Sequence, residues 1–221
     1  MTRPYITLKL ATSLDGRIAT GAGESRWITG EASRAEVQKL RAAHDAVLVG
    51  SGTVRADDPE LLARTAPAPK RQPVRVVLDT EFSIAPSGRL FDTLDRATLL
   101  VIGAADGDAA RRKALQDAGA RTAGAARGPA GIDAEAALAI MREHGLERVL
   151  CEGGGRLAAS LIAAEVVDRI EWFRASIVLG AEGRAGVGSL TLTSLASAPA
   201  FKRVALREVG PDIWESYERA S

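Results

Sequence analysis

The sequence has few of the residues that bind metals or form disulfide bonds. Its 221 residues include one cysteine and two histidines. The single cysteine, Cys151, has no second cysteine with which to form an internal disulfide. This favours a reducing compartment, so we expect a cytoplasmic protein. Structural zinc sites are built from several Cys and His side chains, so the sequence predicts no metal site.

Charge of one sign, aromatic residues and long hydrophobic runs are also scarce. Lys and Arg number 29 against 28 Asp and Glu, a net charge of +1, and aromatic residues make up 4% of the chain. Proteins dedicated to nucleic acids carry a basic surface and aromatic stacking platforms, so we exclude that class. The best apolar run, residues 97–105, is far shorter than the roughly 20 residues that cross a bilayer. No signal sequence precedes the first predicted strand, so we expect no membrane partner.

What remains is the composition of an ordinary globular protein. Hydrophobic residues make up 46% of the chain and charged residues 26%. A chain of this length forms one large domain or two small ones. The two loosest stretches, residues 65–73 and 124–131, are too short to indicate a domain boundary. We therefore expect a single domain over residues 1–221.

Short strand patterns alternate with helix patterns over most of the chain. This alternation is typical of an α/β fold with a largely parallel sheet. Toward the C-terminus the strand patterns follow one another without a helix, so we expect the sheet to end in antiparallel strands. The strands are expected at residues 6–11, 46–50, 74–79, 98–102, 148–151, 166–179, 201–209 and 213–219.

Helix starts are marked by residues that cap the first turn. Ser33 and Glu36 have the spacing of a capping box. Asp108 and Asp133 are suited to cap helices that end before a later glycine. The expected helices are residues 33–44, 108–119, 133–145 and one that follows the glycine run 153–155.

Two basic residues contradict the element in which they are expected, and such conflicts concentrate at functional sites. Lys9 lies on the less apolar face of the first strand, where it is either a solvated lysine or a ligand contact in a cleft. Arg41 falls on the apolar stripe of the helix that begins at Ser33. Its aliphatic stem covers the stripe, or its guanidinium turns toward a phosphate. The residues alone leave both choices open.

Two junctions between a strand, glycines and a helix are suited to phosphate groups. They are residues 47–53 and 149–158, where missing side chains let a ligand approach backbone N–H groups at a helix start. The second junction formally fits the dinucleotide motif G-x-G-x-x-A. A dinucleotide fold also places an acidic residue about 20 residues later, and Glu171 is a poor match because it falls inside a predicted strand. A simple tight turn remains the alternative.

Carboxylates occur at two further points of interest. Glu152 directly follows a hydrophobic strand, at the end where open α/β sheets bind ligands. The Asp-Asp-Pro motif at residues 57–59 marks either a site or a turn that ends a helix. His44 and His144 fall at helix ends, where a cation complements the dipole, so we interpret them as structural. Proton transfers are therefore expected of Lys or carboxylate side chains.

Several longer motifs follow one another along nearly the whole chain. They are KLATSLDGR at residues 9–17, GESRWIT at 23–29, LRA at 40–42, DAVLVGSGTV at 45–54, DDPELLAR at 57–64, RVVLD at 75–79, EGG at 152–154 and GPD at 210–212. In this order they resemble the riboflavin-biosynthesis reductase family, whose members are similar to dihydrofolate reductase in fold. The resemblance implies an α/β protein with a central, mostly parallel sheet, antiparallel C-terminal strands and flanking helices.

The same resemblance implies an NADPH-dependent reduction, in which the ribosyl group of 5-amino-6-(5-phosphoribosylamino)uracil becomes a ribityl chain. In common bacterial members a zinc deaminase precedes the reductase. The H-x-E and P-C-x-x-C elements of a zinc deaminase are absent here, so we expect a stand-alone reductase domain without a deaminase domain or zinc. The resemblance also implies that this protein forms a homodimer.

Three alternatives remain at this point. The substrate is either the uracil or the 2,5-diaminopyrimidinone that precedes deamination. A related enzyme reduces a different compound, such as a pterin, although Arg41 and Arg64 favour a phosphorylated substrate. From another class, the chain is a non-catalytic nucleotide-binding module.

The resemblance also assigns residues to each ligand. It places the substrate against Ser25, Arg41, Leu61, Arg64 and Glu152. It places NADPH against Ala11, Trp27, Thr53, Asp57, Thr80 and the run that begins with Gly154, Gly155, Arg156 and Leu157 and ends at Ser160. We expect the ribosylamine to open to an imine that accepts a hydride from the nicotinamide, which requires alignment of donor and acceptor. Lys9, Asp57 and Glu152 are our candidates for proton transfer or orientation.

Overall fold

The computed structural model describes residues 3–129 and 131–220. The chain is a mixed α/β protein whose residues fall into two compact units that are interleaved in sequence. Unit 1 comprises Gln38–Leu150 together with the first residues of the chain, and unit 2 comprises Ile6–Val37 and Cys151–Ser221. The helix α1 (Glu31–Ala42) begins among the residues of unit 2 and ends among those of unit 1.

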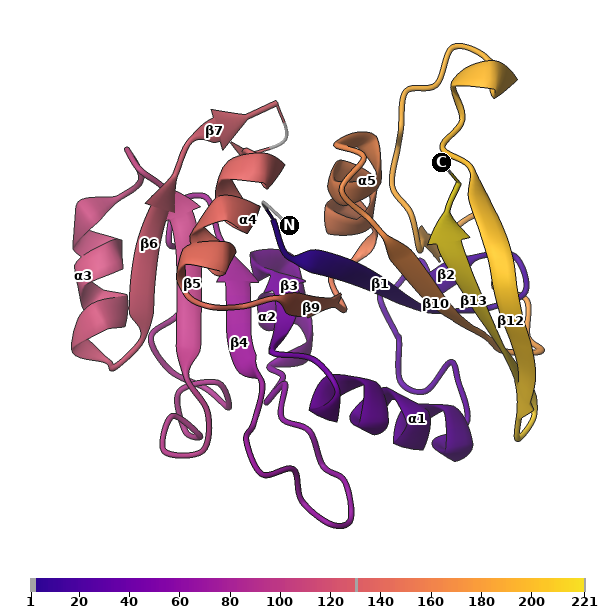
Figure 1. Cartoon of the computed structure of the whole chain (residues 1–221), viewed down its shortest axis with the longest axis horizontal. Helices are drawn as coiled ribbons and strands as arrows, with labels where there is room; N and C mark the ends of the chain where they lie inside the picture. Colours follow the sequence, from indigo (N-terminus) through magenta and orange to yellow (C-terminus); the bar gives the residue numbers. More distant parts are fainter. Residues whose placement is uncertain (1–2, 130, 221) are drawn as a thin grey trace. The chain divides into compact units, whose positions relative to one another are not determined.

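Unit 1 is built on parallel strands, as the alternating patterns predict. Its strand order is β9-β3-β4-β5-β6, and the pairs from β3 to β6 are parallel. The strands are β3 (Ala46–Gly50), β4 (Val74–Leu78), β5 (Leu99–Ala104), β6 (Arg121–Ala125) and β9 (Arg148–Cys151). Parallel strands need long connections, and several of these contain helices (Figure 1). The helices are α2 (Ser51–Asp57), α3 (Ala109–Asp117) and α4 (Ala134–Glu143).

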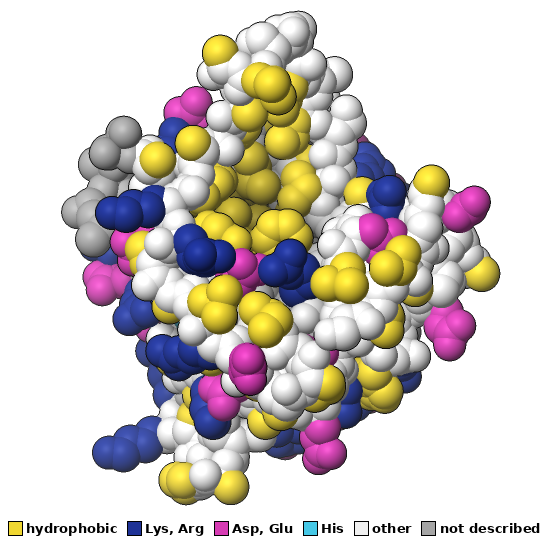
Figure 2. Space-filling view, turned by 90° about the vertical axis from the view of Figure 1, so that its right-hand side faces the viewer, with side chains coloured by type: hydrophobic (Ala, Val, Ile, Leu, Met, Phe, Trp, Pro, Cys, Tyr) yellow, Lys and Arg dark blue, Asp and Glu magenta, His cyan; other side chains and the backbone are white. Residues whose placement is uncertain are grey.

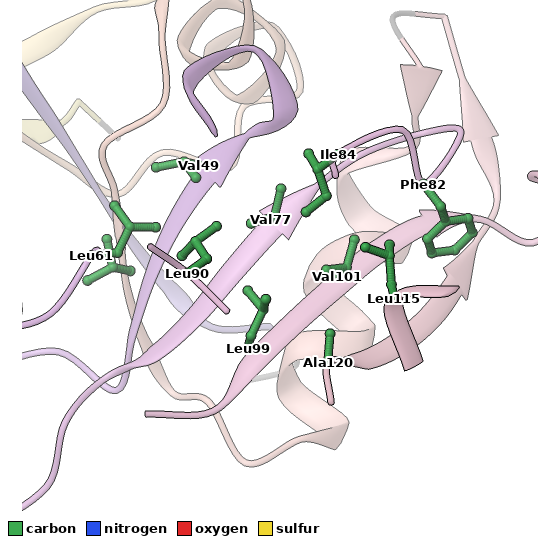
Figure 3. Close-up of a cluster of buried hydrophobic side chains, with 11 residues drawn as sticks. Val49, Leu61, Val77, Phe82, Ile84, Leu90, Leu99, Val101, Leu115 and Ala120 are labelled. Atoms are coloured by element: carbon green, nitrogen blue, oxygen red, sulfur yellow. The ribbon is translucent and has the colours of Figure 1, made fainter. Parts of the chain in front are cut away.

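A cluster of buried hydrophobic side chains holds unit 1 together (Figure 3). Val49, Val77 and Val101 enter it from three neighbouring strands. Leu61 and Leu90 enter it from the two long connections on either side of β4, and their exposed fractions are 3% and 1%. Burial of a leucine side chain stabilises a fold by about 1.5–3 kcal/mol, so the cluster also fixes both connections to the sheet.

Unit 2 combines parallel and antiparallel strands, which confirms the expected C-terminal arrangement. The strand β10 pairs in parallel with β1 and antiparallel with β13, and β13 pairs antiparallel with β12. The strands are β1 (Tyr5–Thr12), β10 (Arg169–Arg174), β12 (Phe201–Val209) and β13 (Asp212–Arg219). The helix α5 (Gly155–Ala163) follows the glycine run, as predicted.

Two expectations for the tail of the chain were wrong. The strand predicted over residues 166–179 is limited to Arg169–Arg174. Beyond it the backbone leaves the sheet, because the N–H groups of Leu179 and Gly180 donate to the Asp15 carboxylate at 3.1 and 2.8 Å. A single 3₁₀ turn, Leu195–Ser197, also lies between β10 and β12, where no helix was expected.

Smaller elements gave no clear pattern in the sequence. The strand β2 (Arg17–Ala19) pairs with β11 (Arg184–Ala185), and β7 (Arg127–Gly128) pairs with β8 (Gly131–Ile132). None of these strands exceeds three residues, too few for a periodic pattern. Within residues 3–129 and 131–220, no helix has the length and apolar character that would let it span a membrane.

The helix starts show which capping predictions held. Asp108 accepts hydrogen bonds from the N–H groups of Ala110 and Arg111, and Asp133 accepts one from Ala136, so both predicted N-caps are confirmed. The capping box at Ser33 was wrong, because α1 already begins at Glu31 and Ser33 lies inside it.

The cap of α1 comes from a distant part of the sequence. The Asp212 carboxylate, on β13, accepts a hydrogen bond from the Gly30 N–H at 2.7 Å and one from the Ser33 hydroxyl at 2.5 Å. Asp212 is 2% exposed. A buried carboxylate at a helix N-terminus satisfies an orphan N–H group and opposes the positive end of the helix dipole. The Ser33 hydroxyl therefore supports this tertiary cap and does not cap the helix itself.

Candidate functional site

The predicted site residues are divided between the two units, and each group is described within its own unit. Unit 1 contains Arg41, Thr53, Asp57, Leu61, Arg64 and Thr80. Unit 2 contains Lys9, Ala11, Ser25, Trp27, Glu152, Gly154, Gly155, Arg156 and Leu157.

Within unit 1 the end of α1 lies against the segment 57–64. Arg41 is half-buried and donates from Nη1 to the carbonyl of Leu62 at 3.0 Å. The N–H of Arg64 donates to the side-chain oxygen of Gln38, one turn earlier on α1, at 2.9 Å. The two predicted phosphate ligands therefore lie on two elements that contact each other, Arg41 on α1 and Arg64 on the segment 57–64. Gln38 was missed in the sequence because a glutamine on a helix gives no distinctive signal.

The segment 57–64 has an irregular backbone. The helix α2 ends at Asp57, and Asp58 is its C-cap with φ of 38°. The Asp-Asp-Pro motif thus forms the helix-ending turn that was one of its two interpretations. Leu61 also has a positive φ, 57°, although its side chain is buried. Such conformations cost non-glycine residues about 1–3 kcal/mol each and persist where surrounding contacts impose them.

A cluster of charges accompanies this segment. The Glu60 carboxylate contacts Arg64 through one oxygen at 3.2 Å and Arg89 through the other at 2.5 Å. The hydrogen bond from Arg89 holds the pKa of Glu60 below its ordinary value. Arg89 was not singled out in the sequence, because it lies in a loop between two strands and no periodic pattern frames it.

Thr80 lies just beyond β4, in a closely packed turn. Its carbonyl accepts a hydrogen bond from Ala104 at 2.9 Å, and a Cβ on Gly131 would lie 2.7 Å from its hydroxyl oxygen. Arg127 is paired with the carboxylates of Glu81, at 2.7 Å, and Asp106, at 2.8 Å. These carboxylates raise the pKa of Arg127. An anion bound beside Thr80 would compete with them for this guanidinium.

In unit 2 the N-terminus of α5 is free of side-chain caps. Gly154 is the N-cap residue, and no side chain accepts from the first turn. Gly155 lies so close to the segment 185–188 that a Cβ would stand 2.3 Å from the Ala185 carbonyl oxygen, and its own carbonyl accepts from the Gly188 N–H at 2.8 Å. Uncapped N–H groups at a helix N-terminus suit an anion, so these residues fit the pyrophosphate of a dinucleotide.

Trp27 offers a second surface in unit 2, since 68% of it is exposed. The guanidinium carbon of Arg34 lies 4.5 Å from the centre of its ring, and Arg34 also donates to the Thr29 carbonyl at 2.7 Å. A cation over an aromatic face stabilises the ring by about 0.5–1 kcal/mol at an exposed site. Arg34, near the start of α1, therefore stabilises the ring of Trp27, which is a predicted cofactor contact.

Lys9 is half-buried on β1 and stands in register with Glu171 on β10. The Glu171 carboxylate is buried and accepts hydrogen bonds from Arg169 at 2.5 Å, and from Trp214 and Ser216 at 2.6 Å each. Lys9 thus lies beside a closed polar cluster and is not a fully solvated lysine. Its role in catalysis stays a prediction.

The remaining candidates agree with structural roles. His44 and His144 lie just past the ends of α1 and α4 and contact the carbonyls of Leu40 and Ile140 through Nδ1, at 2.6 and 2.8 Å. Burial raises the pKa of the Cys151 thiol to about 12, which leaves it protonated and unreactive. Glu152 follows it at the end of β9 and is half-buried. Among the described residues, no group of three metal-binding side chains occurs.

A cavity of about 260 Å³ lies in unit 1 beside His44 and the loop residues 69–72. None of the predicted site residues lines it. The cavity is therefore separate from the candidate site.

Comparison with known proteins identifies the family. The model of the RibD C-terminal domain matches residues 4–214. The chain belongs to the RibD C-terminal domain family. This RibD C-terminal domain is 35% identical over 213 residues to the riboflavin biosynthesis protein RibD of Bacillus amyloliquefaciens, which covers 95% of the chain and 56% of that protein. The chain thus spans little more than half the length of the curated relatives it matches.

Solved structures agree with the RibD C-terminal domain assignment. A RibD structure from Acinetobacter baumannii has a TM-score of 0.85 at 27% identity, with 100% of this chain and 59% of that chain covered. The Saccharomyces cerevisiae riboflavin biosynthesis reductase Rib7 has a TM-score of 0.80 at 20% identity, with 100% and 91% covered. A dihydrofolate reductase from Enterococcus faecalis, complexed with NADP(H), has a TM-score of 0.52 at 12% identity, with 98% and 97% covered. The likeness to dihydrofolate reductase in fold is therefore confirmed.

Proposed function

We propose that this RibD C-terminal domain is an NADPH-dependent reductase of riboflavin biosynthesis, and that it converts the ribosyl group of 5-amino-6-(5-phosphoribosylamino)uracil to ribityl. One observation carries the proposal. The Arg41 side chain and the Arg64 backbone N–H each form a hydrogen bond between α1 and the segment 57–64. Both residues also carry a guanidinium suited to bind a phosphate. The family supplies the reaction class.

The cofactor side of the proposal rests on unit 2. The uncapped start of α5, from Gly154 to Leu157, fits the pyrophosphate, and the exposed face of Trp27 provides a stacking surface. Ala11, Thr53, Asp57 and Thr80 complete the set that the family resemblance assigns. When bound, NADPH supplies the hydride that reduces the ribose carbon.

The protein's own contribution is binding and orientation. Arg41, Arg64 and Ser25 hold the 5′-phosphate, and Leu61 and Glu152 complete the set of substrate contacts that the family resemblance assigns. Lys9, Asp57 and Glu152 are the groups that donate or direct the proton needed when the ring opens.

A kinetic assay tests this proposal. NADPH oxidation is followed at the nicotinamide absorbance with the uracil and the diaminopyrimidinone substrates side by side, and again with NADH. We expect turnover of the uracil and a lower KM for NADPH than for NADH. Preferred turnover of the diaminopyrimidinone would assign the pre-deamination order instead. NADPH binding without turnover of either compound would favour the non-catalytic nucleotide-binding module.

We also propose a cytoplasmic homodimer. Figure 2 shows hydrophobic side chains exposed on one face of the molecule. Among the exposed large hydrophobic side chains of unit 2, several lie on the segment before β12 and on β12 itself, and their exposure supports association. They include Leu192, Leu195, Val204 and Leu206, which are 48%, 95%, 43% and 52% exposed. Sedimentation equilibrium of the native protein and of a Val204→Asp, Leu206→Asp variant tests the dimer, and a monomeric native protein would contradict it.

A further inference from the structure

We propose that Arg89 is a positioning residue for the substrate phosphate, and that it acts through Glu60 on Arg64. The inference rests on the proposed function, because Arg64 is taken as a phosphate ligand. Nothing in the sequence motifs assigns a role to Arg89. Its contacts assign one, because they connect the loop that contains Gly88 and Arg89 to the segment 57–64 at two points.

Arg89 contacts two of the three acidic side chains of that segment, Asp58 and Glu60. Its backbone N–H donates to Asp58 Oδ1 at 2.9 Å, and its Nη2 donates to Glu60 Oε1 at 2.5 Å. The other oxygen of Glu60 contacts Arg64 Nη1 at 3.2 Å. The Glu60 carboxylate therefore lies between two guanidinium groups, one on each oxygen.

The two loops are also joined beneath the surface. Leu61 and Leu90 are buried in the same cluster (Figure 3). Arg75, on β4, has no exposed surface, and its Nη1 donates to the carbonyl of Leu90 at 2.8 Å and reaches that of Glu60 at 3.5 Å. These contacts fix the backbone of the loop that contains Arg89 relative to the segment of Leu61, within reach of Glu60.

Gly88 allows this close approach. Its φ is +88°, and a Cβ there would lie 2.6 Å from Asp58 Oδ1. A side chain at this position is disfavoured by both the backbone conformation and the contact. The glycine therefore lets the turn place Arg89 in contact with Asp58 and Glu60.

This arrangement controls how strongly Glu60 holds Arg64. With Arg89 present, the charge of Glu60 is shared between two cations, and Arg64 keeps donors for a phosphate. Without Arg89, Glu60 loses one of its two close ion-pair contacts, binds Arg64 more strongly and adds a less compensated negative charge beside the phosphate. Both effects oppose an anionic ligand.

A mutant cycle with ribose 5-phosphate as the probe tests the inference. Arg64→Ala should raise the Kd for the probe by roughly ten- to a hundredfold, because a charge-assisted contact is lost. Arg89→Ala should raise it roughly five- to tenfold, and Arg89→Lys by less, since the charge remains. In a Glu60→Gln background, Arg89→Ala should change the Kd by less than about twofold, because its effect passes through Glu60.

Arg111→Ala is the matched control. Arg111 is an exposed arginine of the same unit that pairs with one carboxylate, Asp108, at 3.4 Å. It should leave the Kd within about twofold of the native value. A purely structural role for Arg89 predicts equal losses from Arg89→Ala with and without Glu60→Gln, and that result would overturn the inference. Absence of probe binding by the native protein, or binding that does not depend on Arg64, would overturn it as well.

Turnover separates this inference from the proposed function. NADPH oxidation with the phosphorylated uracil should show a higher KM and an almost unchanged kcat in Arg89→Ala. If the native protein binds ribose 5-phosphate with the expected dependence on Arg64 and Arg89 but turns over neither pyrimidine, the proposed function fails while the role of Arg89 stands.

Discussion

Replacing Asp212 by alanine removes the tertiary cap of α1. The carboxylate is 2% exposed and accepts from the Gly30 N–H and the Ser33 hydroxyl. Hydrogen bonds to a charged group are worth about 1.5–3 kcal/mol each, and loss of an N-cap alone costs about 0.5–2 kcal/mol. The contributions overlap, so we expect Asp212→Ala to lower the free energy of unfolding by about 3 kcal/mol, which corresponds to a fall in Tm of about 6–12 °C for a chain of this size.

Thermal and urea unfolding of three single variants and of the double variant Ser33→Ala, Asp212→Ala measure this effect. Asp108→Ala is the matched control, because Asp108 caps α3 with two backbone hydrogen bonds but is 41% exposed in its side chain. It should cost about 1 kcal/mol. Ser33→Ala should destabilise the native protein but add little to Asp212→Ala, since the shared partner is already gone. A loss from Asp212→Ala no larger than that from Asp108→Ala would refute the reasoning.

Three further perturbations test the site and its surroundings. Arg41→Ala should raise the substrate KM by roughly ten- to a hundredfold in steady-state kinetics and leave the Kd for NADPH within a few-fold. Gly155→Ala should raise the Kd for NADPH by at least about tenfold in a direct titration, because a Cβ 2.3 Å from the Ala185 carbonyl oxygen displaces the start of α5. Asp15→Asn should destabilise the protein at neutral pH and less in acid. The hydrogen bond from Ser13 lowers the pKa of Asp15 to about 2, so its contribution is complete above the ordinary value of about 4 and is lost as the pH falls to about 2.

Each of these tests has an outcome that contradicts it. An unchanged KM with a lower Tm in Arg41→Ala would mean that Arg41 only covers the apolar side of α1. An unchanged Kd for NADPH in Gly155→Ala would mean that the start of α5 does not hold the pyrophosphate. A constant difference in Tm between Asp15→Asn and the native protein from neutral pH to pH about 2 would exclude the role of the Asp15 carboxylate.

Strands with strong hydrophobic patterns were predictable from the sequence because burial on both faces leaves a continuous apolar run. The expected strand 46–50 matches β3, which is buried over four of its five residues. In contrast, β6 was missed, since its sequence RTAGA has little apolar character and only Ala125 is buried. Small residues pack there without leaving a pattern.

Motifs in the sequence marked some residues of the candidate site, but they gave no signal for residues that only tertiary contacts bring to it. Arg41 was singled out because it interrupts an apolar stripe, and its contact with Leu62 connects it to the segment 57–64. Arg75 interrupts an apolar strand in the same way, so the same rule applied to β4 would have indicated it. Arg89 had no such signal, because its partner Glu60 lies 29 residues away, on the other side of β4 in the sequence, and the loop that contains Arg89 has no periodicity.

The exposed strand β12 has a consequence for how the protein behaves at high concentration. It ends the strand order of unit 2, so one edge of its backbone has no neighbouring strand among the described residues. Open edges recruit further strands and start unlimited aggregation. Here the register shifts between Arg203 and Ala205, and the exposed cations Lys202, Arg203 and Arg207 line the strand. The irregular register and the repulsion between like charges disfavour edge-to-edge growth of β12. They oppose aggregation through this edge although hydrophobic side chains are exposed on the same strand.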